Sequence, residues 1–228
     1  VSIEPDLEKL DLSVRRFISL DELRASDSGR IVGPKAAKLG ELRKHYPGRV
    51  SRGVAIPFGL FRQEALEQPH AGGGTVFDWM VENYRQLADM PANDPQRAEK
   101  AEAFRAELYD IITSTTPSEG FQQALRAAMK ETFGAAEPPG LFVRSDTNVE
   151  DLPGFTGAGI NLTVPNVVGF DNIVQAMRDV WASPFTERSY GWRQGIMNDP
   201  EHVYASVLLH RSVNADISGV LVTADAET

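Results

Sequence analysis

Between residues 75 and 133, apolar side chains recur at helical spacing in three consecutive stretches. No other feature of the sequence constrains the fold as much. The stretches run over 75–89, 95–114 and 117–133 and follow the flexible joint "HAGGGT". We interpret the block as a packed helical scaffold without chemistry of its own. The apolar stripe of its second helix contains Ala98, Ala101, Phe104, Leu108, Ile111 and Ile112.

Upstream of this block, short β-type and helical signals alternate. Residues 1–30 predict a lead-in strand or short helix, and "GVAIPFGLF" predicts a short strand broken at Pro57. "GPKAAKLGELRKHYPG" predicts a helix with Pro34 in its first turn and a stop at Gly48. The apolar positions of that helix are Ala36, Leu39, Leu42 and Tyr46.

Downstream, from residue 140, the pattern is again α/β. "LFVRS" predicts a buried strand, and a helix follows over 171–182. Ser183 and Pro184 predict an N-cap and first-turn proline that restart a helix. "VYASVLLH" and "ISGVLVT" predict two strands of a hairpin joined by "RSVNAD". The apolar face of the 171–182 helix contains Phe170, Ile173, Val174, Met177, Val180 and Trp181.

The bulk properties limit the class of protein. A net charge of -9 argues against a nucleic-acid-binding surface, although it leaves room for a local site for a small anion. The absence of cysteine excludes disulfides and thiolate chemistry. The acidic N-terminus "VSIEPDLEKL" does not resemble a secretory signal, and no apolar run approaches the roughly 20 residues of a membrane span. We therefore expect a cytoplasmic protein without a membrane partner.

The chain begins at Val1 without Met and stops directly behind an apolar run, so we expect a piece of a longer protein. Its 228 residues suit one large domain or two closely packed subdomains. We predict the α/β (α+β) class with a mixed sheet. The expected divisions are an N-terminal part at 1–70, a helical insertion at 71–139 and an α/β core at 140–228.

The first candidate functional residues stand at the start of the helix predicted after residue 33. Gly33 supplies a turn, and exposed N–H groups at a helix N-terminus beside the Lys35 cation suit a polyphosphate. "GPK" is a short signal by itself. A solvated lysine beside a turn is the alternative interpretation.

The second candidate is Arg144, which opens the stretch "RSDTNVEDLPGFTGAG". It ends a predicted strand, and ligands of α/β folds bind at the ends of strands. Its planar guanidinium group can donate two parallel hydrogen bonds to phosphate oxygens. A structural ion pair with a neighbouring acid is the open alternative. For those acids (Asp146, Glu150 and Asp151) we favour turn and capping roles over a metal site or a general base.

Three glycines in the same stretch form the third candidate. Without a Cβ they let backbone N–H groups approach an anion, and Thr156 adds a hydroxyl donor. The stretch is neither a Walker A motif nor a GxGxxG fingerprint, and a plain turn remains possible on the sequence alone. The four histidines, at 45, 70, 202 and 210, show no metal-ligand spacing.

Four ordered blocks of the sequence resemble one family. "GPKAAKLGEL" resembles the "GGKxxxLGEL" opening of the ATP-grasp nucleotide-binding domain of phosphoenolpyruvate synthase and pyruvate phosphate dikinase. "VRSDTNVEDLPGFTGAG" resembles that family's "VRSSxxxEDLPxxSFAG". "VWASPFTERSYGWRQ" and "SGVLVTADAET" resemble its "VxASLFxxRAxxYR" and "SGVxFTxDxESG". The α-glucan water dikinases are similar through "NVEDL", "GAG", "VPNV" and "VWAS". The resemblance covers about 35 to 228.

The resemblance implies an ATP site. Lys35 and Arg144 resemble the lysine and arginine that contact ATP phosphates, and Gly154 to Gly159 resembles the glycine-rich loop over the triphosphate. In "LLHRSV", His210 and Ser212 stand where the family has a Gln and a Met beside adenine, which is a departure from the family pattern. The expected nucleotide-contacting residues are Gly33, Lys35, Arg144, Ser145, Gly154, Phe155, Thr156, Gly157, Gly159, His210 and Ser212.

The resemblance also implies a transferase mechanism. A kinase of this family would pass phosphate from Mg-ATP to a histidine on a mobile domain and then to an acceptor, here pyruvate. Lys35 and Arg144 would neutralise phosphate oxygens. The Mg²⁺ ligands, the phosphohistidine domain and the acceptor domain belong to parts of the family that these 228 residues lack, so we expect the chain alone to be inactive. The alternatives are a glucan water dikinase-like enzyme, a non-catalytic nucleotide-binding regulator and an α/β domain whose glycines merely turn.

Overall fold

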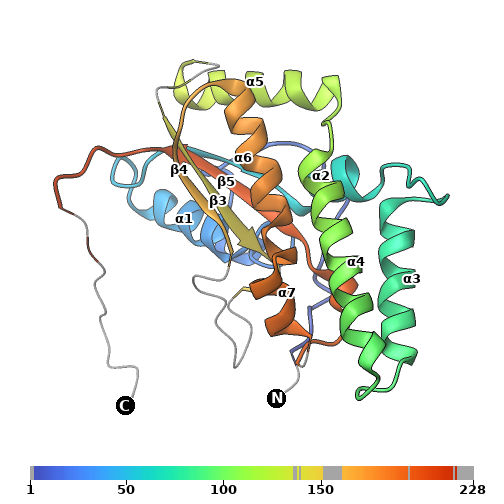
Figure 1. The fold of residues 1–228 in the computed structure, drawn as a ribbon. Helices are drawn as coiled ribbons and strands as arrows, with labels where there is room; N and C mark the ends of the chain where they lie inside the picture. The colour runs from blue at the N-terminus through green and yellow to red at the C-terminus, as the bar shows by residue number, and fades with distance from the viewer. Residues whose placement is uncertain are drawn as a thin grey trace, which may run out of the picture.

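The computed structural model describes residues 3–135, 138, 140–150, 161–194, 196–217 and 219. In this part of the chain a five-stranded sheet carries helices on both faces (Figure 1). The strands are β1 (Ile18–Ser19), β2 (Gly53–Ile56), β3 (Leu141–Thr147), β4 (Thr163–Val167) and β5 (Ala205–Arg211). The α-helices are α1 (Pro34–His45), α2 (Phe58–Phe61), α3 (Val76–Asp89), α4 (Pro95–Ser114), α5 (Glu119–Phe133), α6 (Phe170–Ala182) and α7 (Glu187–Arg193).

The strand order is β1-β2-β5-β3-β4, and every pairing between these strands is antiparallel. The prediction of a mixed sheet is therefore wrong for the described strands. Centrally, β5 pairs with both β2 and β3, and its register sets Arg144 opposite Leu208 and Asp146 opposite Ser206. Because side chains alternate between the faces of a strand, these four side chains share one face of the sheet.

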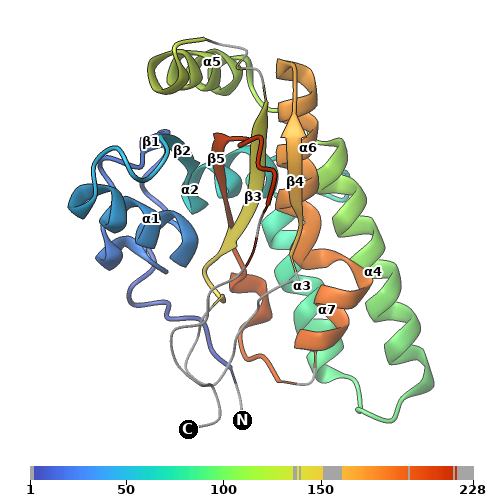
Figure 2. The ribbon, with the colours of Figure 1, turned by 90° about the vertical axis from the view of Figure 1, so that its left-hand side faces the viewer.

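The opposite face carries the main core. There β3 and β5 present Val143, Val207 and Leu209 to a cluster of buried side chains drawn from α3, α4, α5 and α6. Figure 2 shows this helical layer on one side of the sheet and α1 on the other. The three predicted helices of the 75–133 block and the helix at 171–182 are confirmed, and all six predicted apolar side chains of α6 are buried.

Local sequence explains where these helices begin and end. The Thr75 hydroxyl accepts the backbone N–H of Asp78, and the Asp78 carboxylate accepts the backbone N–H of Thr75, which forms a capping box at the start of α3. At α4 and α5, Asp94 and Ser118 accept N–H groups as N-caps. After α5, Gly134 adopts a φ of 80°, the left-handed conformation that commonly ends a helix.

The predicted helix after Gly33 is confirmed as α1. Of its predicted apolar positions Ala36 is buried and Leu39 packs against the core, but the last two are not buried. Leu42 and Tyr46 are 46% and 59% exposed. Small residues instead let the helix lie close to the preceding segment: a Cβ on Gly40 would lie 2.6 Å from the Leu23 carbonyl oxygen. The buried positions of α1 are Pro34, Ala36, Ala37 and Gly40.

Several smaller predictions need correction. β2 confirms the short strand and its break at Pro57, but the residues after Pro57 form α2 and not strand. Ser183 starts a 3-10 turn, and Thr186 rather than Ser183 caps the next helix, α7. Strand β4 was not predicted, because its exposed "TVPNV" has neither clear alternation nor an apolar run. β5 confirms the first predicted strand of the C-terminal hairpin, and "ISGVLVT" falls largely outside the described residues.

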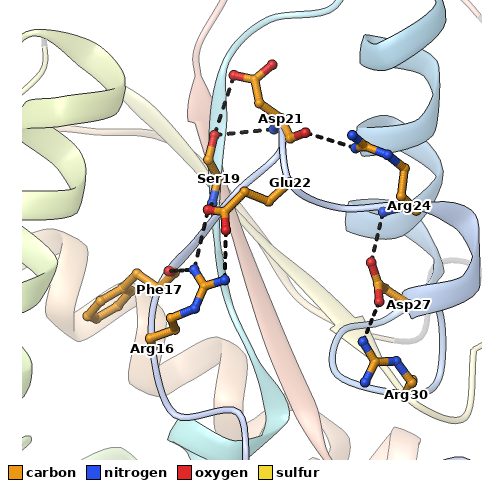
Figure 3. Close-up of polar contacts among 8 residues, drawn as sticks. All are labelled: Arg16, Phe17, Ser19, Asp21, Glu22, Arg24, Asp27 and Arg30. Atoms are coloured by element: carbon orange, nitrogen blue, oxygen red, sulfur yellow. Dashed lines mark hydrogen bonds and ion pairs between the residues drawn. The ribbon is translucent and has the colours of Figure 1, made fainter.

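The predicted lead-in segment contains β1 and a 3-10 turn at Ala25–Asp27. Figure 3 shows the polar contacts among eight residues of this segment. Arg16 pairs with Glu22 at 2.7 Å, and Asp27 accepts the Arg24 backbone N–H at 2.9 Å and an Arg30 guanidinium N–H at 2.8 Å. An exposed pair such as Arg16–Glu22 adds little stability by itself. Among the described residues, no helix has both the length and the apolar character needed to cross a membrane.

Candidate functional site

The N-terminus of α1 is held by a carboxylate from β3. The Asp146 side chain accepts the backbone N–H groups of Lys35 at 2.7 Å and Ala36 at 2.9 Å. The Gly33 N–H donates to the Ser206 hydroxyl at 3.0 Å, and that hydroxyl donates to the Asp146 carbonyl oxygen at 2.6 Å. The N–H groups that we expected to be free for a polyphosphate are therefore bonded within the protein.

Gly33 is required by this close approach. A Cβ at position 33 would lie 2.6 Å from the Asp146 backbone carbonyl carbon and would overlap its carboxylate. The residue has a φ of -77°, which any amino acid can adopt, so space rather than backbone conformation is the constraint. The glycine lets α1 dock against the end of β3.

The Lys35 side chain points to the same end of β3. Its ammonium donates to the Ser145 carbonyl oxygen at 3.0 Å and forms an ion pair with Glu150. The other Glu150 oxygen accepts the Asn161 side-chain N–H at 3.0 Å. Lys35 thus contacts Ser145, the residue that follows Arg144 in the chain. One third of the Lys35 side chain remains exposed.

The buried Asp146 carboxyl is the most strongly perturbed acid of the site. Burial and the nearby Glu150 charge raise the pKa of Asp146 from 3.8 to about 7, against the opposing effects of the two N–H donors and Lys35. The folded chain therefore holds this proton more tightly than the unfolded chain does.

This shift predicts a pH dependence of stability. A raised folded-state pKa means that the stability contributed by the protonated group is present below roughly pH 4 and is lost as the pH rises to about 7. We expect the free energy of unfolding, measured by urea titration, to fall across this window in the wild type. The fall should be smaller in Asp146→Asn, which cannot titrate. Equal slopes in both proteins would contradict the assignment.

Arg144 lies on the same face, two residues before Asp146 along β3. Its guanidinium meets the His210 ring nitrogen at 3.3 Å, and the His210 ring stacks on Phe142 with centroids 5.3 Å apart. Burial and the Arg144 charge lower the pKa of His210, so the ring is neutral near pH 7 and can donate or accept a hydrogen bond. Among the described contacts, Arg144 forms no ion pair with Asp146 or Glu150, two of the acids in the alternative prediction. The third, Asp151, lies outside the described residues.

A hollow of about 520 Å³ opens at the far end of this face. Ser212 lines it, and the Ser212 N–H donates to the Gly140 carbonyl oxygen at 3.0 Å, continuing the pairing of β5 with β3. Of the two residues predicted to lie beside adenine, Ser212 is among the residues that line the hollow and His210 is not. Its lining residues are Gly140, Phe142, Asn166, Arg211, Ser212, Val213 and Asn214.

Six of the eleven predicted site residues are described. Gly33, Lys35 and Ser145 meet at one end of β3, and Arg144, His210 and Ser212 follow along the same face toward the other end. The other five, Gly154, Phe155, Thr156, Gly157 and Gly159, lie outside the described residues. Within the described part, no group of three or more acids and histidines is arranged to hold a metal ion.

Sequence reasoning missed Ser206, whose hydroxyl joins Gly33 to the Asp146 carbonyl oxygen. Ser206 carries no motif, and only the β3–β5 register shows that it faces Asp146. For Asp146 the sequence predicted a turn or capping role within its own loop. The Asp146 carboxylate instead accepts N–H groups at the start of α1, about 110 residues away in the chain.

Comparisons with known proteins identify the family of the chain. Residues 29–228 match the family model "Pyruvate phosphate dikinase, AMP/ATP-binding domain". A rifampicin phosphotransferase from Streptomyces sp is 31% identical over 219 residues, covering 95% of this chain and 23% of that protein. A probable phosphoenolpyruvate synthase from Methanothermobacter thermautotrophicus is 28% identical, covering 96% and 30%.

The phosphoenolpyruvate synthase of Escherichia coli is also 28% identical, covering 91% of this chain and 25% of that protein. The chain therefore spans less than a third of the length of these relatives. With 200 consecutive positions matched (29 to 228), the family is established, as the sequence blocks predicted. This chain belongs to the pyruvate phosphate dikinase AMP/ATP-binding domain family.

Proposed function

We propose that this domain binds the triphosphate of Mg-ATP with Lys35 and Arg144 and serves an enzyme that transfers the phosphoryl group through a phosphohistidine. The observation that carries the proposal is the shared sheet face: the Asp146 side chain, on the same face of β3 as Arg144, accepts the Lys35 backbone N–H, and the Lys35 ammonium donates to the Ser145 carbonyl oxygen between them. Two cations from segments more than 100 residues apart lie at adjacent places along β3. Such convergence suits a polyanion.

The order of groups along this face supports one orientation of a bound nucleotide. Lys35 lies at the carboxyl end of β3, Arg144 follows, and the His210–Phe142 stack and the Ser212 hollow come last. A nucleotide laid along the strand would place its phosphates at the Lys35 end and its base near the stacked rings. The catalytic work of the two cations is charge neutralisation and orientation, not proton transfer.

Magnesium and the acceptor belong to this proposal as well. Mg²⁺ would shield the phosphate oxygens, with ligands drawn from outside the described residues. For the acceptor we propose pyruvate, as in a phosphoenolpyruvate synthase. The rifampicin phosphotransferase relative makes a rifamycin-type acceptor the alternative.

The experiment uses the complete natural protein. Isothermal titration with ATP and Mg²⁺ should give saturable binding, and incubation with γ-labelled or β-labelled ATP should leave an acid-labile label on a histidine. Chasing the labelled protein with pyruvate or with rifampicin then identifies the acceptor by the product that carries the label. Absence of saturable ATP binding would refute the nucleotide site. Binding without a labelled histidine would favour a regulatory domain.

A further inference from the structure

Glu150 is the acidic residue with the most direct contact to the proposed phosphate-binding lysine. One carboxylate oxygen pairs with the Lys35 ammonium and the other accepts the Asn161 amide at 3.0 Å. Asp146, the other nearby acid, is occupied by the backbone N–H groups at the start of α1. Glu150 is therefore the side-chain partner of the Lys35 charge within the described residues.

Burial makes this pair different from an ordinary surface ion pair. The Glu150 side chain is 7% exposed and the Lys35 side chain is 33% exposed. A buried carboxylate that loses its cation is left uncompensated, which is far more costly than breaking an exposed pair. We therefore expect Lys35 to stay paired with Glu150 when a second anion binds nearby.

The donor count of the ammonium leaves room for such an anion. A lysine ammonium has three N–H donors, and the Ser145 carbonyl and Glu150 account for two of them. The third can bond a phosphate oxygen without breaking either contact. A long, flexible side chain fixed at two points also loses less conformational entropy when a ligand binds.

Resting on the proposed ATP site, we propose that Glu150 is a positioning residue: it fixes the Lys35 ammonium at the end of β3 so that one N–H remains for the triphosphate. Glu150 itself does not touch the nucleotide. Its negative charge opposes the phosphates, so any benefit it gives to ATP binding must pass through Lys35.

A double-mutant cycle on ATP affinity tests this in the complete natural protein. Glu150→Gln keeps the size of the side chain and removes the anionic anchor. We expect it to weaken ATP binding at least fivefold in the wild-type background and not at all in Lys35→Ala. Glu150→Asp, which keeps the carboxylate one methylene shorter, should recover part of the lost affinity. Adenosine, which has no phosphate, should bind all variants alike.

Each outcome decides between explanations. Equal weakening in both backgrounds would show a structural role unrelated to Lys35, and unchanged or tighter ATP binding in Glu150→Gln would show that Glu150 only competes with the phosphates. Either result overturns the inference. Glu99→Ala, at an exposed position of α4, is the matched control and should bind ATP as the wild type does. If the wild type itself fails to bind ATP, the proposed function fails, which is a separate result.

Discussion

Replacing Gly33 by alanine should destabilise the chain by about 2–4 kcal/mol. The added methyl group would overlap the Asp146 carboxylate and lie 2.6 Å from its backbone carbonyl carbon, so the start of α1 must move away from β3. Overpacking of a tight contact typically costs about 1–3 kcal/mol, and loss of a helix cap about 1 kcal/mol more. Urea or thermal unfolding of the 228-residue chain measures the change.

Gly120→Ala supplies the matched control for Gly33→Ala. Gly120 is exposed near the start of α5, and a Cβ there would meet no described atom within 4 Å. Alanine is the better helix former, so this variant should be neutral or stabilised by up to about 1 kcal/mol. A Gly33→Ala protein as stable as Gly120→Ala would show that the contact between Gly33 and Asp146 is looser than described.

Replacing Lys35 or Arg144 by alanine should slow ATP-dependent self-phosphorylation of the complete natural protein at least tenfold. That corresponds to about 1.4 kcal/mol or more in the activation barrier, because each variant removes a cation proposed to stabilise charge on the transferred phosphoryl group. Initial rates of label incorporation from ATP measure the effect. Circular dichroism and melting temperature establish that the variants are folded.

The control for these cation variants is Lys44→Ala. Lys44 lies in the last turn of the same helix as Lys35, its side chain is 52% exposed, and it forms a 3.8 Å ion pair with Glu41. It should retain the wild-type rate. If both Lys35→Ala and Arg144→Ala keep near wild-type rates while folded, the assignment of the phosphate site is wrong.

The sequence predicted the helices with strong local signals most accurately. The predicted starts of the helices in the 75–133 block lie within two residues of those of α3, α4 and α5, because caps such as Thr75 and Asp94 act within a single turn. The buried stripe of α6 followed from its 3.6-residue periodicity alone. Local chemistry was sufficient in these segments.

Features that depend on distant partners could not be predicted in the same way. Leu42 and Tyr46 fit a helical stripe, yet α1 is buried through its small residues, because Gly40 permits close contact with Leu23. Edge strand β4 has no apolar alternation and exists through pairing with β3. The antiparallel arrangement of the sheet likewise depends on distant partners, because β5 pairs with both β2 and β3.

In the candidate site, too, some features were predictable from the local sequence and others depend on distant partners. Lys35 and Arg144 were proposed from sequence blocks, but Lys35 lies beside β3 because Asp146 bonds the start of α1, a contact that no block contains. Ser206 and Glu150 act through contacts to residues far away in the chain, 173 positions for Ser206 to Gly33 and 115 for Glu150 to Lys35. No local pattern contains such contacts.

The Ser206 hydroxyl, which joins Gly33 to the Asp146 carbonyl, has a consequence for biosynthesis. During synthesis the first turn of α1 leaves the ribosome long before the serine that completes its docking, and contacts of such large sequence separation form late in folding. We expect nascent chains stalled before residue 206 to be cleaved by protease near residues 30–36. Chains stalled well beyond residue 206 should resist cleavage near residues 30–36. Equal protection in the two sets of chains would show that the start of α1 docks on β3 without β5.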